Sequence, residues 1–206
     1  MAPRTRVAIF ISGRGSNMTA LIEAARDPAF PAEIALVLSN NPDAPGLRTA
    51  SDTGIPTLAI DHRPHRRDRE AHEREIDAAL VEAGIGLVCL AGYMRLLTPF
   101  LTSRWQGRML NIHPSLLPAF PGLHTHERAL AAGVKLHGCT VHLVTEIMDE
   151  GPIVGQAAIL VRPDDTPALL GERVLAQEHR LYPAALARHL GAGAPTEQAD
   201  RTLLSV

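Results

Sequence analysis

The sequence lacks the features that mark secreted, membrane and nucleic-acid-binding proteins. Only two of its 206 residues are cysteines, too few for a disulfide framework. Lysine plus arginine number 20 and aspartate plus glutamate 22, so no excess of positive charge points to nucleic acid or an acidic membrane. The apolar run after the first six residues is too short for a signal peptide or a bilayer span. We therefore expect a cytoplasmic protein without a nucleic-acid or membrane partner.

What is present is typical of a globular α/β protein. Hydrophobic residues make up 46% of the chain and charged residues 20%, which are ordinary values. The length fits one α/β domain or two small ones. No internal repeat or linker-like change of composition divides the chain, so we expect one domain over residues 1–206. Cys89 and Cys139 stand in apolar runs, which favours buried free thiols.

Apolar runs alternate with segments of helical periodicity. Strands are expected at 6–12, 33–39, 57–61, 87–91 and 109–113, and helices at 17–26, 46–53 and 67–83. The apolar side of the third helix is expected to hold Ile76, Leu80 and Val81. This alternation predicts a Rossmann-like, mostly parallel sheet with helices on both faces.

The last third of the chain departs from that alternation. Two strands at 134–145 and 153–162 lie close in sequence, which favours antiparallel pairing at a mixed edge of the sheet. A long helix is expected at 165–190, with a kink or a break at Pro183. The tail 191–206 is small and polar, and we expect it to be mobile.

Ligands of such sheets bind outside the carboxyl ends of the strands. The first strand runs into a loop at 12–17, Ser-Gly-Arg-Gly-Ser-Asn, followed by a helix. Glycines let the backbone approach a ligand, and N–H groups at a helix start favour an anion. Met18 stands where a dinucleotide fingerprint has its third glycine, and Asn40 where it has an acidic residue. The loop therefore indicates phosphate binding, with a plain tight turn as the alternative.

Two further strand ends carry candidate chemistry. Asn111 and His113 share one face of a strand, because side chains alternate with a period of two. An amide beside an imidazole suits acyl transfer, in which one stabilises an oxyanion and the other manages a proton. Asp149, in a later loop, can orient the imidazole or can simply be solvated. The apolar loop from Met94 to Leu97 either lines a pocket for a flat ring or packs in the core.

The ten histidines raise the question of a metal site. The candidates are His124, His126, His137 and His142. None has the spacing of a His-Glu-x-x-His motif or of a Cys–His zinc site. We expect no functional metal.

Three motifs in one order resemble a known family. They are Ser-Gly-Arg-Gly-Ser-Asn at 12–17, Asn-Ile-His-Pro-Ser-Leu-Leu-Pro at 111–118, and Gly-Cys-Thr-Val-His at 138–142 with Asp-Glu-Gly-Pro at 149–152. Together they resemble the folate-dependent formyltransferases, and within these the phosphoribosylglycinamide formyltransferases, from residue 6 to about residue 190. The resemblance implies the formyltransferase fold, with residues 1–110 binding the ribonucleotide phosphate and 111–190 carrying the catalytic loop.

The resemblance also implies an activity and its residues. The formyl group of 10-formyltetrahydrofolate would pass to the amine of glycinamide ribonucleotide, in a monomer or a homodimer. Asn111, His113 and Asp149 would be catalytic, while Gly15, Ser16, Asn17 and Glu178 would bind the ribonucleotide. The folate would be bound by Arg69, Met94, Arg95, Leu96, Leu97, Asn111, Thr145, Glu146, Ile147, Met148 and Asp149. Ala119 departs from the family pattern, which often has a longer polar side chain there.

Other functions remain open from the sequence. Methionyl-tRNA formyltransferase and formyltetrahydrofolate deformylase share the motif at 111–118. Each has an additional domain that we do not expect here, since the sequence starts at its first strand and ends after its last long helix. The deformylase would use the same residues with water as the acceptor. A module that only binds folates or nucleotides would need no Asn–His–Asp group. Met18 and Asn40 disfavour a nicotinamide-dependent dehydrogenase.

Overall fold

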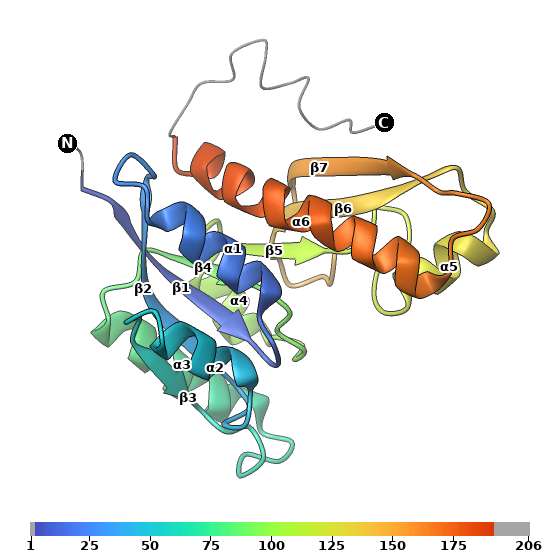
Figure 1. Ribbon diagram of the computed structural model, residues 1–206. Helices are drawn as coiled ribbons and strands as arrows, with labels where there is room; N and C mark the ends of the chain where they lie inside the picture. The colour runs from blue at the N-terminus through green and yellow to red at the C-terminus, as the bar shows by residue number, and fades with distance from the viewer. Residues whose placement is uncertain (1–2, 192–206) are drawn as a thin grey trace.

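The fold is a twisted seven-stranded sheet with helices on both faces. In the computed structural model, which describes residues 3–191, the strand order is β3-β2-β1-β4-β5-β6-β7 (Figure 1). The strands are β1 (Thr5–Ile11), β2 (Ala32–Ser39), β3 (Thr57–Ala59), β4 (Leu87–Leu90), β5 (Met109–His113), β6 (Leu136–Leu143) and β7 (Ile153–Leu160). The helices are α1 (Ser16–Ala25), α2 (Pro45–Ser51), α3 (Arg69–Glu82), α4 (Pro99–Arg104), α5 (Thr125–Ala131) and α6 (Pro167–His189).

The first five strands are parallel, and the last two are antiparallel to their neighbours. This confirms the predicted parallel sheet with a mixed edge. β4 ends at Leu90, which pairs with Asn111, whereas β5 continues to His113. Ile112 and His113 therefore lie beyond the end of the neighbouring strand, where there is room for a ligand.

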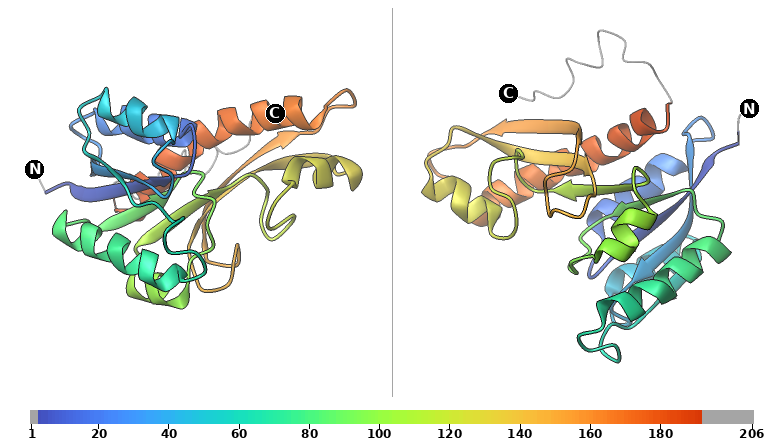
Figure 2. Two further views of the ribbon diagram at one scale, coloured as in Figure 1. Left: turned by 90° about the horizontal axis from the view of Figure 1, so that it is seen from below. Right: turned by 180° about the vertical axis from the view of Figure 1, so that it is seen from behind.

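Each face of the sheet has its own apolar core. One core packs α1 and α6 on the sheet through side chains such as Leu21, Val174 and Tyr182. The other packs α3 and α4 on the opposite face through Ile76, Leu80 and Trp105. Figure 2 shows this three-layer arrangement, with α1, α2 and α6 on one side of the sheet and α3 and α4 on the other. The free thiols of Cys89 and Cys139 are buried in the first core, as the sequence predicts.

One local prediction is wrong, one of two alternatives does not occur, and two short helices were not predicted. Val81 is 59% exposed, because the buried side of α3 includes the polar residues His72, Glu73 and Asp77 instead. The chain remains helical through Pro183, so that no break occurs there. Helices α4 and α5 were not predicted, because they are six and seven residues long and too short to show a helical period.

Residues 192–206, which include nearly all of the tail expected to be mobile, lie outside the described residues. Among residues 3–191, no helix combines the length and the apolar character needed to cross a membrane.

The hydroxyl of Tyr182 links α6 to the two central strands. It is fully buried and lies 3.1 Å from the carbonyl oxygens of both Leu90 and Leu110. We expect Tyr182→Phe to lower the free energy of unfolding by about 1–2 kcal/mol in urea denaturation, since it leaves buried carbonyls without their donor. Tyr93→Phe is the control, because the Tyr93 hydroxyl has no hydrogen bond within the described chain. Equal stability of the Tyr182 variant and the wild type would contradict this role.

Candidate functional site

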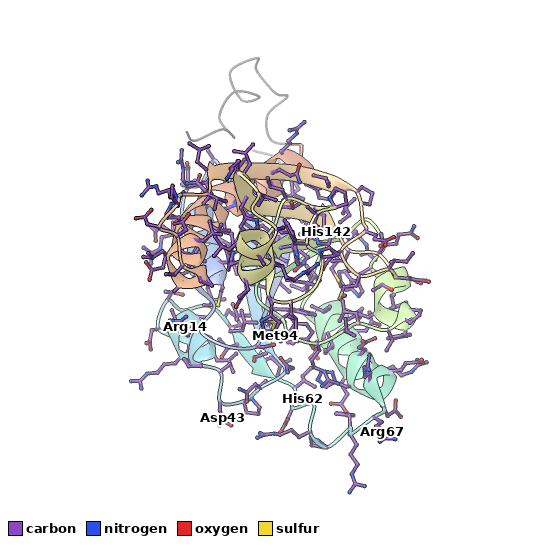
Figure 3. The ribbon with its side chains drawn as sticks, turned by 90° about the vertical axis from the view of Figure 1, so that its right-hand side faces the viewer. Arg14, Asp43, His62, Arg67, Met94 and His142 are labelled. Carbon is purple, nitrogen blue, oxygen red and sulfur yellow. The ribbon has the colours of Figure 1, made fainter. Side chains whose placement is uncertain are left out.

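A cavity of ≈ 860 Å³ opens at the carboxyl ends of β1 and β4 and along the outer part of β5. Figure 3 looks onto this side of the molecule, with Met94 between His142 and His62. The predicted site residues that line the cavity are Asn17, Met94, Arg95, Leu96, Leu97, Asn111, His113, Thr145, Glu146, Ile147, Met148, Asp149 and Glu178. These residues from five separate segments therefore meet at one place, as the strand-end argument predicts.

The loop after β1 forms a smaller cavity of ≈ 290 Å³ that adjoins the large one. Gly15 and Ser16 line it, and Asn17 lines both cavities. Gly15 caps α1 in the left-handed conformation, with φ 71°. At Gly46 of α2, a Cβ atom would lie 2.9 Å from the carbonyl oxygen of Gly13, so only glycine allows this close packing. The main chain at the start of α1 therefore lines the cavity, and N–H groups at the start of a helix are suited to binding an anion.

A buried polar pair connects this loop to α6. Asn17 Nδ2 donates a 2.6 Å hydrogen bond to Glu178 Oε2. Burial raises the pKa of Glu178, an effect partly offset by that hydrogen bond. Asn17 Oδ1 is buried and finds no partner within residues 3–191. Asn17 and Glu178 both line the large cavity, and this pair retains unused hydrogen-bonding capacity.

Asn111 is held by a histidine of the antiparallel neighbour. The β5–β6 register places Asn111 opposite His142, and Asn111 Nδ2 lies 3.1 Å from His142 Nε2. His142 Nδ1 lies 3.0 Å from the Leu143 carbonyl oxygen, which can only accept, so Nδ1 carries the proton and Nε2 accepts from Asn111. Burial lowers the pKa of His142, which keeps this ring neutral. One N–H of the Asn111 amide is thereby fixed, and the other is left for a ligand.

His113 lies between two hydrogen-bond acceptors. Its Nε2 is 3.1 Å from the carbonyl oxygen of Phe120, and its Nδ1 is 3.5 Å from Asp149 Oδ2. The side chains of His113 and Asp149 are each only 8% exposed. Because acceptors face both ring nitrogens, the geometry suits the doubly protonated imidazolium ion.

Asp149 is oriented by the backbone of another loop. The backbone of Asp149 has φ 59°, and Asp149 Oδ2 accepts a 2.8 Å hydrogen bond from the N–H of Gly122. Its Oδ1 lies 3.7 Å from His142 Nε2, but the neutral tautomer of that ring has no proton there to share. The carboxylate of Asp149 therefore lies close to both rings, and its charge opposes the larger effect of burial, which lowers the pKa of His142.

The turn after β5 is fixed by one hydroxyl. Thr140 Oγ1 donates to the carbonyl oxygen of Ser115 at 2.7 Å and accepts from the N–H of Leu117 at 3.0 Å. Gln156 Nε2, from β7, also contacts Thr140 Oγ1 at 3.0 Å. Ala119, where the family pattern often has a longer side chain, is exposed on this turn.

The apolar end of the cavity is lined by exposed hydrophobic side chains from two loops. Met94 is 73% exposed, and Leu96, Ile147 and Met148 are also exposed. Clustered exposed apolar surface marks a ligand or partner site more often than loose packing. The Met94 N–H donates to Ser12 Oγ at 2.8 Å, so the apolar loop is tied to the anion loop.

A residue that the sequence analysis did not single out supports the apolar loop from below. Glu73, on α3, is almost fully buried and accepts hydrogen bonds from the N–H of Thr98, at 2.8 Å, and from its hydroxyl. Burial raises the pKa of Glu73, and the bonds from Thr98 oppose that change. No local sequence pattern indicates this role of Glu73, because the role depends on the packing of α3 against α4.

Some predicted residues lie elsewhere, and some lining residues were not predicted. Arg69, at the start of α3, lines neither cavity. Tyr93, Thr102, Leu123, His124, Thr125, His126, Glu127 and His142 line the large cavity without having been assigned to the site. Within the described chain, no group of three or more His, Cys, Asp or Glu residues is placed to hold a metal ion.

Comparison with known proteins shows which family has this arrangement. The family model described as "Formyl transferase" matches residues 5–186. The chain is 41% identical over 180 residues to phosphoribosylglycinamide formyltransferase of Escherichia coli, covering 87% of this chain and 84% of that one. The crystal structure of phosphoribosylglycinamide formyltransferase from Brucella melitensis superposes with a TM-score of 0.87 at 56% identity, covering 94% of this chain and 98% of that one.

Longer relatives contain the same region. The human trifunctional purine biosynthetic protein adenosine-3 is 48% identical over 183 residues. This match covers 89% of the chain but only 18% of the human protein. The chain belongs to the formyl transferase family, and within it to the group of phosphoribosylglycinamide formyltransferases.

A buried histidine, His137, which contacts His126 of the cavity lining, makes stability depend on pH. His137 is 1% exposed, and its Nε2 lies 3.1 Å from His126 Nδ1. Burial, together with the neighbouring His126 and His113, lowers the pKa of His137 to about 4. Between the unfolded value of about 6.5 and this value, the unfolded chain binds the extra proton, so the free energy of unfolding falls as the pH falls.

We therefore expect urea denaturation between pH 7 and 4.5 to show a loss of stability with acid. His137→Asn should reduce the slope by up to about 1.4 kcal/mol per pH unit, because one proton no longer contributes. The exposed His124 provides the control, and His124→Asn should leave the slope unchanged. An unchanged slope in the His137 variant would show that this ring does not titrate on unfolding.

Proposed function

We propose that the chain transfers the formyl group of 10-formyltetrahydrofolate to the primary amine of N1-(5-phospho-D-ribosyl)glycinamide in de novo purine (IMP) biosynthesis. The observation that carries this proposal is the position of Asn111, His113 and Asp149. All three line the large cavity, which adjoins the anion loop and is also lined by exposed apolar side chains. Membership of the formyl transferase family already implies a folate-derived donor in general terms.

In this proposal, the ribonucleotide binds at the anion loop. The N–H groups of Gly15, Ser16 and Asn17 at the start of α1 hold its phosphate. Glu178, whose Oε2 lies 2.6 Å from Asn17 Nδ2, accepts hydrogen bonds from the ribose hydroxyls. Asn17 Oδ1, which has no partner within residues 3–191, accepts a hydrogen bond from a further donor of the ligand. The glycinamide amine then points along the cavity towards Asn111.

The folate binds at the apolar end. Its pterin ring lies between the loop of Met94, Arg95, Leu96 and Leu97 and the loop of Thr145, Glu146, Ile147, Met148 and Asp149, with Asn111 at its formyl end. Apolar side chains supply the contact area, and main-chain groups of the loops supply specific hydrogen bonds. Arg69 lies outside the cavity wall and meets only the benzoyl-glutamate part of the folate.

The reaction needs no covalent enzyme intermediate. The amine nitrogen attacks the formyl carbon, and the second N–H of Asn111 and the charge of the His113 imidazolium stabilise the developing oxyanion. The bond between the carbon and N10 of the folate then breaks. Asp149 keeps His113 charged and, through a water molecule, passes the proton from the amine to the leaving N10. The whole chain acts as one formyltransferase domain, with the phosphate bound by residues 1–110 and the catalytic loop in 111–190.

Removing either polar group of this wall should reduce turnover while the fold remains intact. Asn111→Ala removes one oxyanion donor, worth roughly 3 kcal/mol, so kcat should fall about 100-fold. Asp149→Asn removes the charge that pairs with His113, and should lower kcat by about 100-fold or more. Steady-state kinetics and circular dichroism test this, with Ala119→Ser on the same turn as the control. Near wild-type kcat in either variant would refute the assigned role.

The acceptor is tested by following folate product formation with and without glycinamide ribonucleotide. Turnover that requires the ribonucleotide supports the transferase. Equal turnover without it, accompanied by formate release, would instead indicate a hydrolase that uses the same residues with water as the acceptor. A folded protein that binds folate but gives no turnover under either condition would refute the proposed reaction.

A further inference from the structure

The segment between β4 and α4 makes few hydrogen bonds to the rest of the protein. Residues 93–97 form no helix or strand and line the large cavity. Within residues 3–191, the main chain of this segment makes a single hydrogen bond, which the N–H of Met94 donates to Ser12 Oγ at 2.8 Å. The other N–H and carbonyl groups of the segment are therefore free to bind a ligand.

The two ends of the segment are fixed independently. Before it, the carbonyl oxygen of Gly92 accepts a hydrogen bond from the N–H of Ser12 at 3.1 Å. After it, the N–H of Thr98 donates to Glu73 at 2.8 Å. Between these points, the bond to the Ser12 hydroxyl fixes the Met94 N–H. Because a peptide unit is planar, that bond also fixes the direction of the preceding carbonyl group.

The Ser12 hydroxyl has no proton left for the ribonucleotide phosphate. A serine hydroxyl has one donor proton, and Ser12 Oγ donates it to Asn40 Oδ1 at 2.6 Å while it accepts from Met94. A phosphate dianion can only accept, so it would have to displace Asn40. Ser12 lines the small cavity with the rest of the anion loop, residues 12–17, but its hydroxyl is engaged with the segment that lines the large one.

Asn40 holds the Ser12 hydroxyl from the end of β2. It directly follows the last residue of that strand and is only 5% exposed. Its carbonyl oxygen accepts a hydrogen bond from the N–H of His62 at 3.2 Å, which fixes its main chain. A dinucleotide-binding fold has an acidic residue at this position to bind a ribose. In this chain the amide oxygen accepts from Ser12 instead, so the residue serves the protein and not a nucleotide.

We propose that Ser12, held by Asn40, is a positioning residue for the folate: its hydroxyl sets the conformation in which residues 93–97 bind the donor. This inference rests on the proposed function, which places the pterin against this segment. The substrate affected is the folate, although Ser12 belongs to the loop that binds the ribonucleotide. Figure 3 shows Arg14, of the anion loop, and Met94 on the same side of the molecule, and both line the small cavity with Ser12.

The test compares both KM values of Ser12→Ala with those of the wild type. The KM for 10-formyltetrahydrofolate should rise about threefold to tenfold, since one hydrogen bond that orders the segment is lost. The KM for glycinamide ribonucleotide and kcat should change by less than about twofold, because the loss affects binding of the donor alone. Titration calorimetry with the product tetrahydrofolate should show the same rise in Kd without turnover.

A double-mutant cycle tests the role of Asn40. Asn40→Ala should raise the KM for the donor by a smaller factor than Ser12→Ala, because the hydroxyl loses its acceptor but still accepts from Met94. Combining the two changes should add little to Ser12→Ala alone, since both act through one hydroxyl. The matched control is Ser51→Ala, at an exposed position at the end of α2, which should leave both KM values unchanged.

An unchanged KM and Kd for the folate in Ser12→Ala would overturn the proposal. A rise confined to the KM for the ribonucleotide would also overturn it and would make Ser12 a phosphate ligand, and equal losses for both substrates would indicate a general structural role. Thermal unfolding verifies that each variant is folded, and Asn40→Ala carries the same test if Ser12→Ala is not. Failure of the proposed function would be distinct, because the wild type would then give no ribonucleotide-dependent turnover while calorimetry still compares folate binding.

Discussion

The site depends on β5 extending beyond the end of β4 on one side while it pairs with β6 on the other. β4 stops at Leu90, opposite Asn111, so the last two residues of β5 have no strand on that side. On the other side, antiparallel β6 places His142 opposite Asn111 and Thr140 opposite His113. The gap gives the ligand access to the strand, and the pairing fixes the side chains that meet it. A parallel strand in place of β6 would give the access without this register.

Hydrogen bonding, rather than distance from Asp149, distinguishes His113 from His142. Asp149 lies 3.5 Å from His113 and 3.7 Å from His142, which are nearly equal separations. His142 donates through Nδ1 to a carbonyl oxygen and accepts from Asn111, so it stays neutral and serves to orient the amide. His113 faces acceptors at both nitrogens and suits the charged form. Two histidines at similar distances from one carboxylate therefore have different roles: His142 orients the Asn111 amide, and His113 pairs with Asp149.

Sequence reasoning predicted many of the residues that line the cavity, because strand ends can be recognised from the sequence. The glycines before Asn17 and the two-residue spacing of Asn111 and His113 both reflect local backbone geometry, and local geometry is encoded locally. The role of His142 depends on the β5–β6 register, and that of Glu73 on α3 meeting α4. Both are long-range contacts that no short window of sequence contains. Val81 was misplaced for the same reason: tertiary hydrogen bonds bury polar residues on α3 in preference to an apolar one.

The polar groups of the cavity cost stability that a ligand can restore. A buried carbonyl without a donor, such as Asn17 Oδ1, is unfavourable by about 1–3 kcal/mol. Burial also disfavours the charged form of Glu178, which raises its pKa. An apolar pair of similar size would pack here without either cost, so stability alone does not account for these residues. The cost is explained if both groups are positioned in advance for donors that arrive with a substrate, because a preformed site loses less entropy on binding.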